Sequence, residues 1–85
     1  MGNSNYSNFK AFEGTVTGVE TLEFDWRPRS ITISNDSASS NLKFKFNLGD
    51  SWATLKAGET VNPEIIIRRV YLSTDGANYR VWGIG

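Results

Sequence analysis

The sequence predicts an all-β fold: a small antiparallel β-sandwich or barrel of about seven to eight short strands with a flexible N-terminal arm. Apolar and polar residues alternate along residues 21–26 and 43–46, as they do in strands with one buried and one solvent-exposed face. Gly, Pro and Asn residues separate such segments at short intervals, which is typical of turns between antiparallel strands. No segment shows the period of an amphipathic helix.

The chain divides into residues 1–8, a polar arm rich in Asn and Ser, and residues 9–85, a single β-sandwich domain. The arm carries too little apolar surface to fold alone. Within the domain, Pro28 separates the second expected strand from the third, because proline cannot donate a ladder hydrogen bond. The expected strands cover residues 9–17, 21–26, 30–35, 42–48, 52–55, 60–67, 70–74 and 79–84.

Apolar residues at alternate positions of these strands are expected to form the core, together with two of the three tryptophans. The expected core residues are Phe12, Val16, Leu22, Phe24, Trp26, Ile31, Ile33, Leu42, Phe44, Phe46, Trp52, Val70 and Leu72. The run of three isoleucines at residues 65–67 breaks the alternation of the sixth strand. Either both faces of that strand are covered or the strand contains a bulge.

The composition argues against an enzyme and against a bound cofactor or metal. The chain has 85 residues and neither cysteine nor histidine, so it has no disulfide, no ordinary general base near neutral pH and no Ser-His or Cys-His pair. No acidic loop has the spacing of an EF-hand. Glu23 and Asp25 are two residues apart and share a strand face, but that face is expected to be the solvent-exposed one.

The formal net charge is zero but unevenly distributed. Residues 1–26 hold one basic and four acidic residues, whereas residues 27–85 hold eight basic and five acidic residues. One interpretation is that antiparallel strands carry ion pairs across their exposed faces. The other is that an acidic and a basic edge favour head-to-tail contact between copies, as a homo-oligomer. A neutral chain argues against nucleic acid as a partner, and no apolar stretch is long enough to span a membrane.

Six residues are the candidates for contacts with other proteins. Tyr6 and Phe9 would anchor the arm on a neighbour, and Arg68 and Arg69 form a basic pair that is either a solvated turn or a contact to an acidic surface. In the last strand Arg80 and Trp82 share a face with Ile84, opposite Tyr79 and Val81, and the sequence leaves open which face points inward. An outward row of Trp, Arg and Ile would be an association patch. The candidates are Tyr6, Phe9, Arg68, Arg69, Arg80 and Trp82.

Several strand and turn motifs follow one another in the second part of the chain. An I-x-I-x-N-D strand at residues 31–36 is followed by a Phe-rich strand at residues 42–47 and a W-x-x-L-x-x-G-E turn at residues 52–59. A closing pair of strands comes after them, at residues 70–73 and 79–83. In this order of motifs, residues 30–85 resemble small all-β structural proteins encoded by tailed bacteriophages. These motifs are mostly fold-determining strands and turns, and no catalytic or ligand-binding residue comes with them.

What the resemblance implies is a non-enzymatic virion protein, assembled in the host cytoplasm, whose partners are the major capsid protein or other virion proteins. Capsid decoration in many copies is the expected role. A head-tail connector or a tail accessory protein is the alternative within the same class. An alternative of another class is a carbohydrate-binding module for a host surface glycan, with a platform of aromatic side chains. The platform candidates are Trp26, Trp52, Tyr71, Tyr79 and Trp82.

Overall fold

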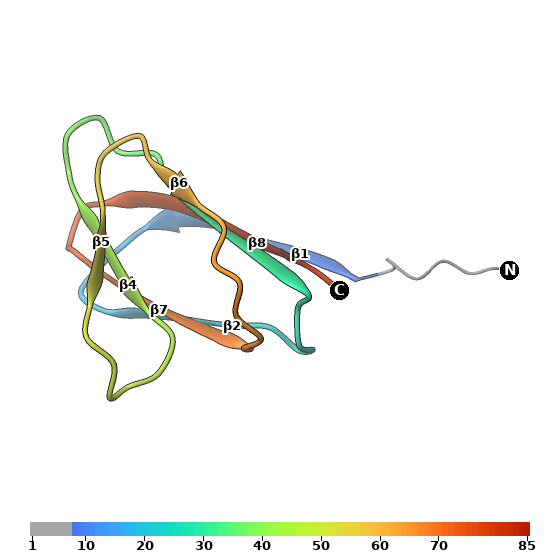
Figure 1. The fold of residues 1–85 in the computed structure, drawn as a ribbon. Coiled ribbons are helices and arrows are strands. Elements are labelled where there is room, and N and C mark those ends of the chain that lie inside the picture. Colours follow the sequence, from blue (N-terminus) through green and yellow to red (C-terminus); the bar gives the residue numbers. More distant parts are fainter. Residues whose placement is uncertain (1–7) are drawn as a thin grey trace, which may run out of the picture.

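The protein is a sandwich of two four-stranded antiparallel sheets in the computed structural model, which describes residues 8–85 (Figure 1). Its strands are β1 (Phe9–Thr15), β2 (Glu20–Glu23), β3 (Ser30–Asn35), β4 (Leu42–Lys45), β5 (Ala53–Leu55), β6 (Thr60–Val61), β7 (Arg69–Ser73) and β8 (Asn78–Ile84). One sheet has the order β1-β8-β3-β6 and the other β2-β7-β4-β5. The predicted all-β fold is confirmed. Residues 8–85 contain no helix that could cross a membrane.

The core lies between the inner faces of the two sheets. Every strand except β1 and β6 supplies a buried apolar side chain, and Val16, Phe24 and Ala77 join the core from connecting segments. The rings of Phe12 and Phe24 meet edge to face at 5.2 Å between centroids, and Trp26 packs on Phe24 at 5.6 Å. Trp26 is half-buried against the core, so its predicted inward direction is correct.

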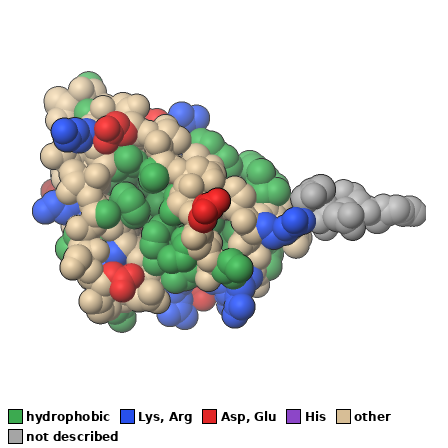
Figure 2. Space-filling model, in the orientation of Figure 1, with side chains coloured by type: hydrophobic (Ala, Val, Ile, Leu, Met, Phe, Trp, Pro, Cys, Tyr) green, Lys and Arg blue, Asp and Glu red, His purple; other side chains and the backbone are tan. Residues whose placement is uncertain are grey.

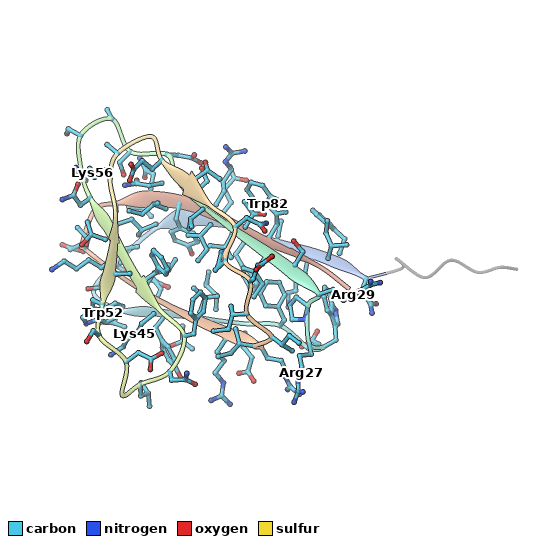
Figure 3. The ribbon with its side chains drawn as sticks, viewed as in Figure 1. Arg27, Arg29, Lys45, Trp52, Lys56 and Trp82 are labelled. Carbon is cyan, nitrogen blue, oxygen red and sulfur yellow. The ribbon has the colours of Figure 1, made fainter. Side chains whose placement is uncertain are left out.

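The predicted core position of Trp52 is wrong. Leu55 is the buried residue of β5, and residues three apart in an extended chain point to opposite faces. Trp52 is therefore half-buried on the outer side, where Nζ of Lys45 lies 4.4 Å from its ring centroid. Figure 3 shows these two side chains next to each other, at a distance from Trp82 on the other sheet.

The predicted sixth strand, residues 60–67, is also wrong beyond its first two residues. Pairing with β3 is limited to Thr60 and Val61. Pro63 has no N–H for a ladder, and the Asn62 side chain donates to Thr32 Oγ1 at 2.8 Å. Neither a bulge nor a strand covered on both faces explains the isoleucine run. Residues 62–68 instead cross the open side between β6 and β7, where Ile67 packs on the core and hydrophobic side chains are visible at the surface (Figure 2).

Smaller differences concern strand ends. The strand predicted to reach residue 17 ends at Thr15, and the one predicted to reach residue 48 ends at Lys45, before a turn in which Asp50 Oδ2 accepts a hydrogen bond from Asn47 N. Of the predicted arm, residues 1–7 lie outside the described residues. Asn8 is described, and its carbonyl extends the β1–β8 ladder by accepting from Gly85 N at 2.9 Å.

A buried asparagine joins two loops at one end of the sandwich. The Asn35 side chain donates to the carbonyls of Ser40 and Leu55 and accepts from the backbone N–H of Ser37, at 2.8, 2.9 and 3.0 Å. It is only 1% exposed. A buried amide of this kind contributes to stability because all its hydrogen-bonding groups have partners. The predicted loop at residues 35–41 is therefore anchored at its first residue.

Candidate functional site

The outer face of the β1–β8 pair carries three of the six predicted contact residues, Phe9, Arg80 and Trp82. Tyr79 and Val81 are buried in the core, so the question that the sequence leaves open is answered: Trp82 points outward with its neighbours on the same face. The antiparallel register places Phe9 opposite Ile84, Ala11 opposite Trp82 and Glu13 opposite Arg80. Two strands distant in the sequence thus build one continuous surface.

The apolar half of this surface, formed by Phe9, Ala11, Trp82 and Ile84, is called the aromatic face here. Phe9 is 64% exposed and Ile84 is 39% exposed. Trp82 is half-buried, and Ala11 opposite it is too small to cover its ring. An open groove runs along this region and is bordered by Phe9, Trp82 and, at its polar end, Arg80. Exposed aromatic and aliphatic side chains beside an arginine are typical of protein–protein contacts.

Next to the aromatic face, the outer edge of β1 has no strand neighbour among residues 8–85. The carbonyl of Asn8 accepts from Gly85, and the N–H of Val16 donates to Ala77. Even-numbered residues of β1 therefore bond to β8, because hydrogen-bonding groups alternate sides along a strand. The N–H and C=O groups of Phe9, Ala11, Glu13 and Thr15 point away from the sheet. Such an edge is able to pair with a strand of another chain.

The polar half of the surface is fixed by an ion pair. Arg80 Nε donates to Asp36 Oδ2 at 2.6 Å, and a second guanidinium nitrogen donates to Oδ1 at 3.3 Å. This hydrogen bond from Arg80 holds the pKa of the Asp36 carboxyl below its ordinary value and raises the pKa of Arg80. The Arg80 guanidinium carbon lies 5.6 Å from the ring centroid of Trp82. Arg80 thus lies at the border of the aromatic face, where its ion pair with Asp36 holds it in place.

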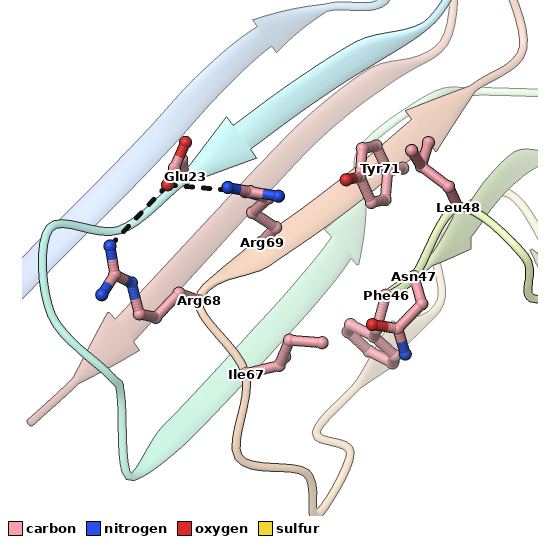
Figure 4. Close-up of a pocket in the computed structure, with 8 residues that line it drawn as sticks. All are labelled: Glu23, Phe46, Asn47, Leu48, Ile67, Arg68, Arg69 and Tyr71. Atoms are coloured by element: carbon pink, nitrogen blue, oxygen red, sulfur yellow. Dashed lines mark ion pairs between the residues drawn. The ribbon is translucent and has the colours of Figure 1, made fainter.

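Arg68 and Arg69 belong to a separate surface, at the start of β7, called the arginine pocket here (Figure 4). Both side chains reach the same oxygen of Glu23, with N–O distances of 3.8 Å for Arg68 and 3.4 Å for Arg69. A hydrogen bond with Tyr71 raises the pKa of Arg69. The pocket combines these polar groups with apolar ones. It is lined by Glu23, Phe46, Leu48, Arg68, Arg69 and Tyr71, among others.

The structure explains the uneven charge of the sequence by cross-strand pairing. β1 pairs with β8 and β2 pairs with β7, so that Glu13 is opposite Arg80 and Glu23 is opposite Arg69. Lys10 and Asp25 are 3.8 Å apart. Glu23 and Asp25 are exposed, as predicted. Among the ion pairs within residues 8–85, only those of Glu23 with Arg68 and Arg69 join the acidic first part of the sequence to the basic second part. Cross-strand pairing therefore accounts for part of the uneven charge.

Five of the six predicted contact residues lie within residues 8–85, and they divide between the two surfaces. Phe9, Arg80 and Trp82 meet on the outer face of β1 and β8, whereas Arg68 and Arg69 lie on the other sheet. Tyr6 lies outside the described residues. Ala11 is not among the predicted contact residues, because only the strand register shows which residue lies opposite Trp82. In residues 8–85, no three acidic side chains converge where a metal ion would bind.

Comparison with known proteins adds no family to this description. No protein-family model, curated protein or solved structure matches the chain.

Proposed function

We propose that this chain is a non-enzymatic structural protein of a tailed-bacteriophage particle, which decorates the capsid by binding the major capsid protein in many copies. Two things support this proposal. One is the resemblance of residues 30–85 to phage structural proteins. The other is the aromatic face, which is the observation that carries the argument, because it gives a small β-domain a surface suited to docking on a larger protein.

The aromatic face has the composition of a binding surface. Burying a largely exposed aromatic or aliphatic side chain contributes about 1.5–3 kcal/mol. Phe9 and Ile84 lie opposite each other, so one partner surface would cover both at once. A contact of this kind gives one copy a modest affinity for the shell. Because the shell repeats the same surface many times, every bound copy adds to the stability of the shell.

The unpaired edge of β1 adds a second kind of contact to the same place. A partner strand that paired with β1 would gain main-chain hydrogen bonds, and its side chains would continue the outer face that begins with Phe9 and Ala11. Main-chain pairing supplies affinity, while the apolar side chains supply specificity. The two features together favour docking of an extended protein segment rather than a flat contact of side chains alone.

The test is attachment to particles that lack the protein. Purified chain is mixed with such particles and pelleted, and the bound fraction is measured over a concentration series. The double variant Phe9→Ser/Ile84→Ser is expected to bind at least about tenfold more weakly, which corresponds to about 1.4 kcal/mol. Ile66→Ser is the matched control, since Ile66 is 72% exposed but belongs to the 62–68 segment and is not part of the aromatic face. Equal binding of both variants and the wild type would contradict the proposal.

A further inference from the structure

The arginine pocket carries the positive charges of Arg68 and Arg69, and the single carboxylate of Glu23 neutralises only part of them. Two guanidinium groups share one carboxylate oxygen of Glu23, although each guanidinium has five N–H donors. The side chains of Arg68 and Arg69 are 50% and 53% exposed. Apolar surface lies beside them, because Leu48 is 73% exposed. A ligand of this pocket would carry negative charge next to an apolar group.

The loop between β1 and β2 has that chemistry. Val19 is 62% exposed at its tip and is followed by Glu20, and Asp75 of the neighbouring β7–β8 turn accepts a hydrogen bond from Gly18 N at 3.3 Å. These three residues, Val19, Glu20 and Asp75, are called the acidic tip. Neither carboxylate takes part in any ion pair identified within residues 8–85. The tip therefore carries two negative charges around an exposed apolar side chain.

The acidic tip is held in one conformation. Oε2 of Glu20 accepts hydrogen bonds from the N–H of Thr17 at 3.1 Å and from its hydroxyl at 2.9 Å. Gly18 adopts a φ of 82°, a left-handed conformation that side chains disfavour. Each carboxylate uses a single oxygen in these bonds. A preformed loop loses little conformational freedom when it binds, which favours its use as a docking element.

The tip and the pocket lie at opposite ends of the same pair of strands. Glu20 begins β2 and Glu23 ends it, while Arg69 begins the antiparallel β7 and Asp75 follows its end. Within one molecule the two surfaces cannot meet. Two copies displaced along the β2–β7 direction bring the tip of one molecule to the pocket of the next.

We propose that copies of this chain associate head to tail, with the acidic tip of one copy seated in the arginine pocket of the next. Val19 packs on Leu48, and the carboxylates of Glu20 and Asp75 approach Arg68 and Arg69. A contact between two different surfaces is heterologous, so it closes into a ring if the rotation between copies permits and otherwise continues as a row. It uses none of the residues of the aromatic face, and it stands independently of the proposed attachment to a capsid.

Sedimentation velocity over a concentration series tests this contact. The wild-type chain is expected to gain mass with concentration and to lose it in about 1 M salt, where the Debye length is about 3 Å. A pocket variant, Leu48→Ser/Arg68→Glu, and a tip variant, Val19→Ser/Asp75→Lys, are each expected to associate at least about tenfold more weakly. The substituted side chains are all exposed, so both variants should fold, which circular dichroism checks.

A mixture of the two variants tests the contact most specifically. The tip variant keeps an intact pocket and the pocket variant keeps an intact tip, so an equimolar mixture is expected to form dimers and nothing larger. Phe9→Ser is the control that should self-associate like the wild type. Monomeric wild type at every concentration, or undiminished association of both variants, would overturn the proposal. A protein that self-associates normally but does not bind particles contradicts only the proposed function, because the two contacts use different residues.

Discussion

Ala11 lies directly opposite Trp82 in the β1–β8 ladder, and this small residue leaves the indole ring accessible at the centre of the aromatic face. On the other side of β8, Thr32 lies opposite the same tryptophan. The face exists because the strand register brings a small residue, and not a large one, to this position.

The first prediction follows from that pairing. Ala11→Arg should place a long charged side chain over the groove and reduce attachment to particles at least about tenfold, with a change in stability within about 0.5 kcal/mol, as is usual for a surface substitution. Thr15→Arg is the control, because Thr15 is on the same strand and the same outer face, beyond Glu13. Attachment and urea denaturation are measured for both. Equal attachment of the two variants would mean that the groove is not used.

The second prediction concerns the edge of β1. The N–H of Ala11 points away from the sheet and that of Lys10 points toward β8, so Ala11→Pro should keep the ladder whereas Lys10→Pro breaks it. Lys10→Pro is expected to lower the free energy of unfolding by about 1–3 kcal/mol more than Ala11→Pro does, because it leaves a buried hydrogen-bonding group without its partner. Urea denaturation compares the two variants. Equal losses of stability would refute the assignment of the free edge.

The third prediction concerns the contact of Gly83 with the core. A Cβ atom at Gly83 would lie 2.8 Å from the ring of Phe24 and 3.1 Å from Cβ of Pro28, both of which are fully buried. Neither neighbour has room to move, so Gly83→Ala should destabilise the fold by about 1–3 kcal/mol through overpacking. Gly49→Ala is the control, because nothing lies within 4 Å of the position of its Cβ. Thermal or urea denaturation of both variants is the measurement, and equal stability would count against the packing described.

The fourth prediction is a pH dependence that involves Asp36. The hydrogen bond from Arg80 lowers the pKa of Asp36 in the folded state, so its contribution to stability is present above the unfolded pKa of about 3.9 and is lost as pH falls through the folded pKa. Asp36→Asn should therefore be less stable than the wild type at neutral pH, with the difference shrinking as the pH falls through the folded pKa of Asp36. Urea midpoints over this range measure it. A difference that does not vary with pH would exclude the ionised pair as its cause.

The sequence predicts a strand well where apolar and polar residues alternate and turn-forming residues bound the same segment. The expected strand at residues 30–35 matches β3, with Ile31 and Ile33 buried as predicted. The prediction of a strand fails at residues 60–67. The apolar composition suggested a strand there, but Pro63 and the side chain of Asn62 end the pairing with β3. Local composition identifies a strand only where a neighbour is able to pair with it.

The candidate surfaces were harder to predict because they depend on strand order and register. Alternation assigns Trp82 and Val81 to opposite faces of β8 but does not say which face is buried. The contact of Gly83 with Phe24 belongs to the inner face, and it becomes visible only when the chain is folded. The uneven charge likewise allows two interpretations in the sequence, and only the strand order shows that Glu23 of β2 lies opposite Arg69 of β7.

The number of copies of this chain in a purified phage particle, determined by quantitative mass spectrometry, tests the central proposal most directly. Capsid decoration predicts hundreds of copies, in a fixed ratio to the major capsid protein. A number between six and a few dozen would contradict decoration and indicate a connector or tail protein. Absence of the chain from the particle would contradict a virion role altogether, and a titration with host surface glycans, followed by tryptophan fluorescence, would become the next experiment.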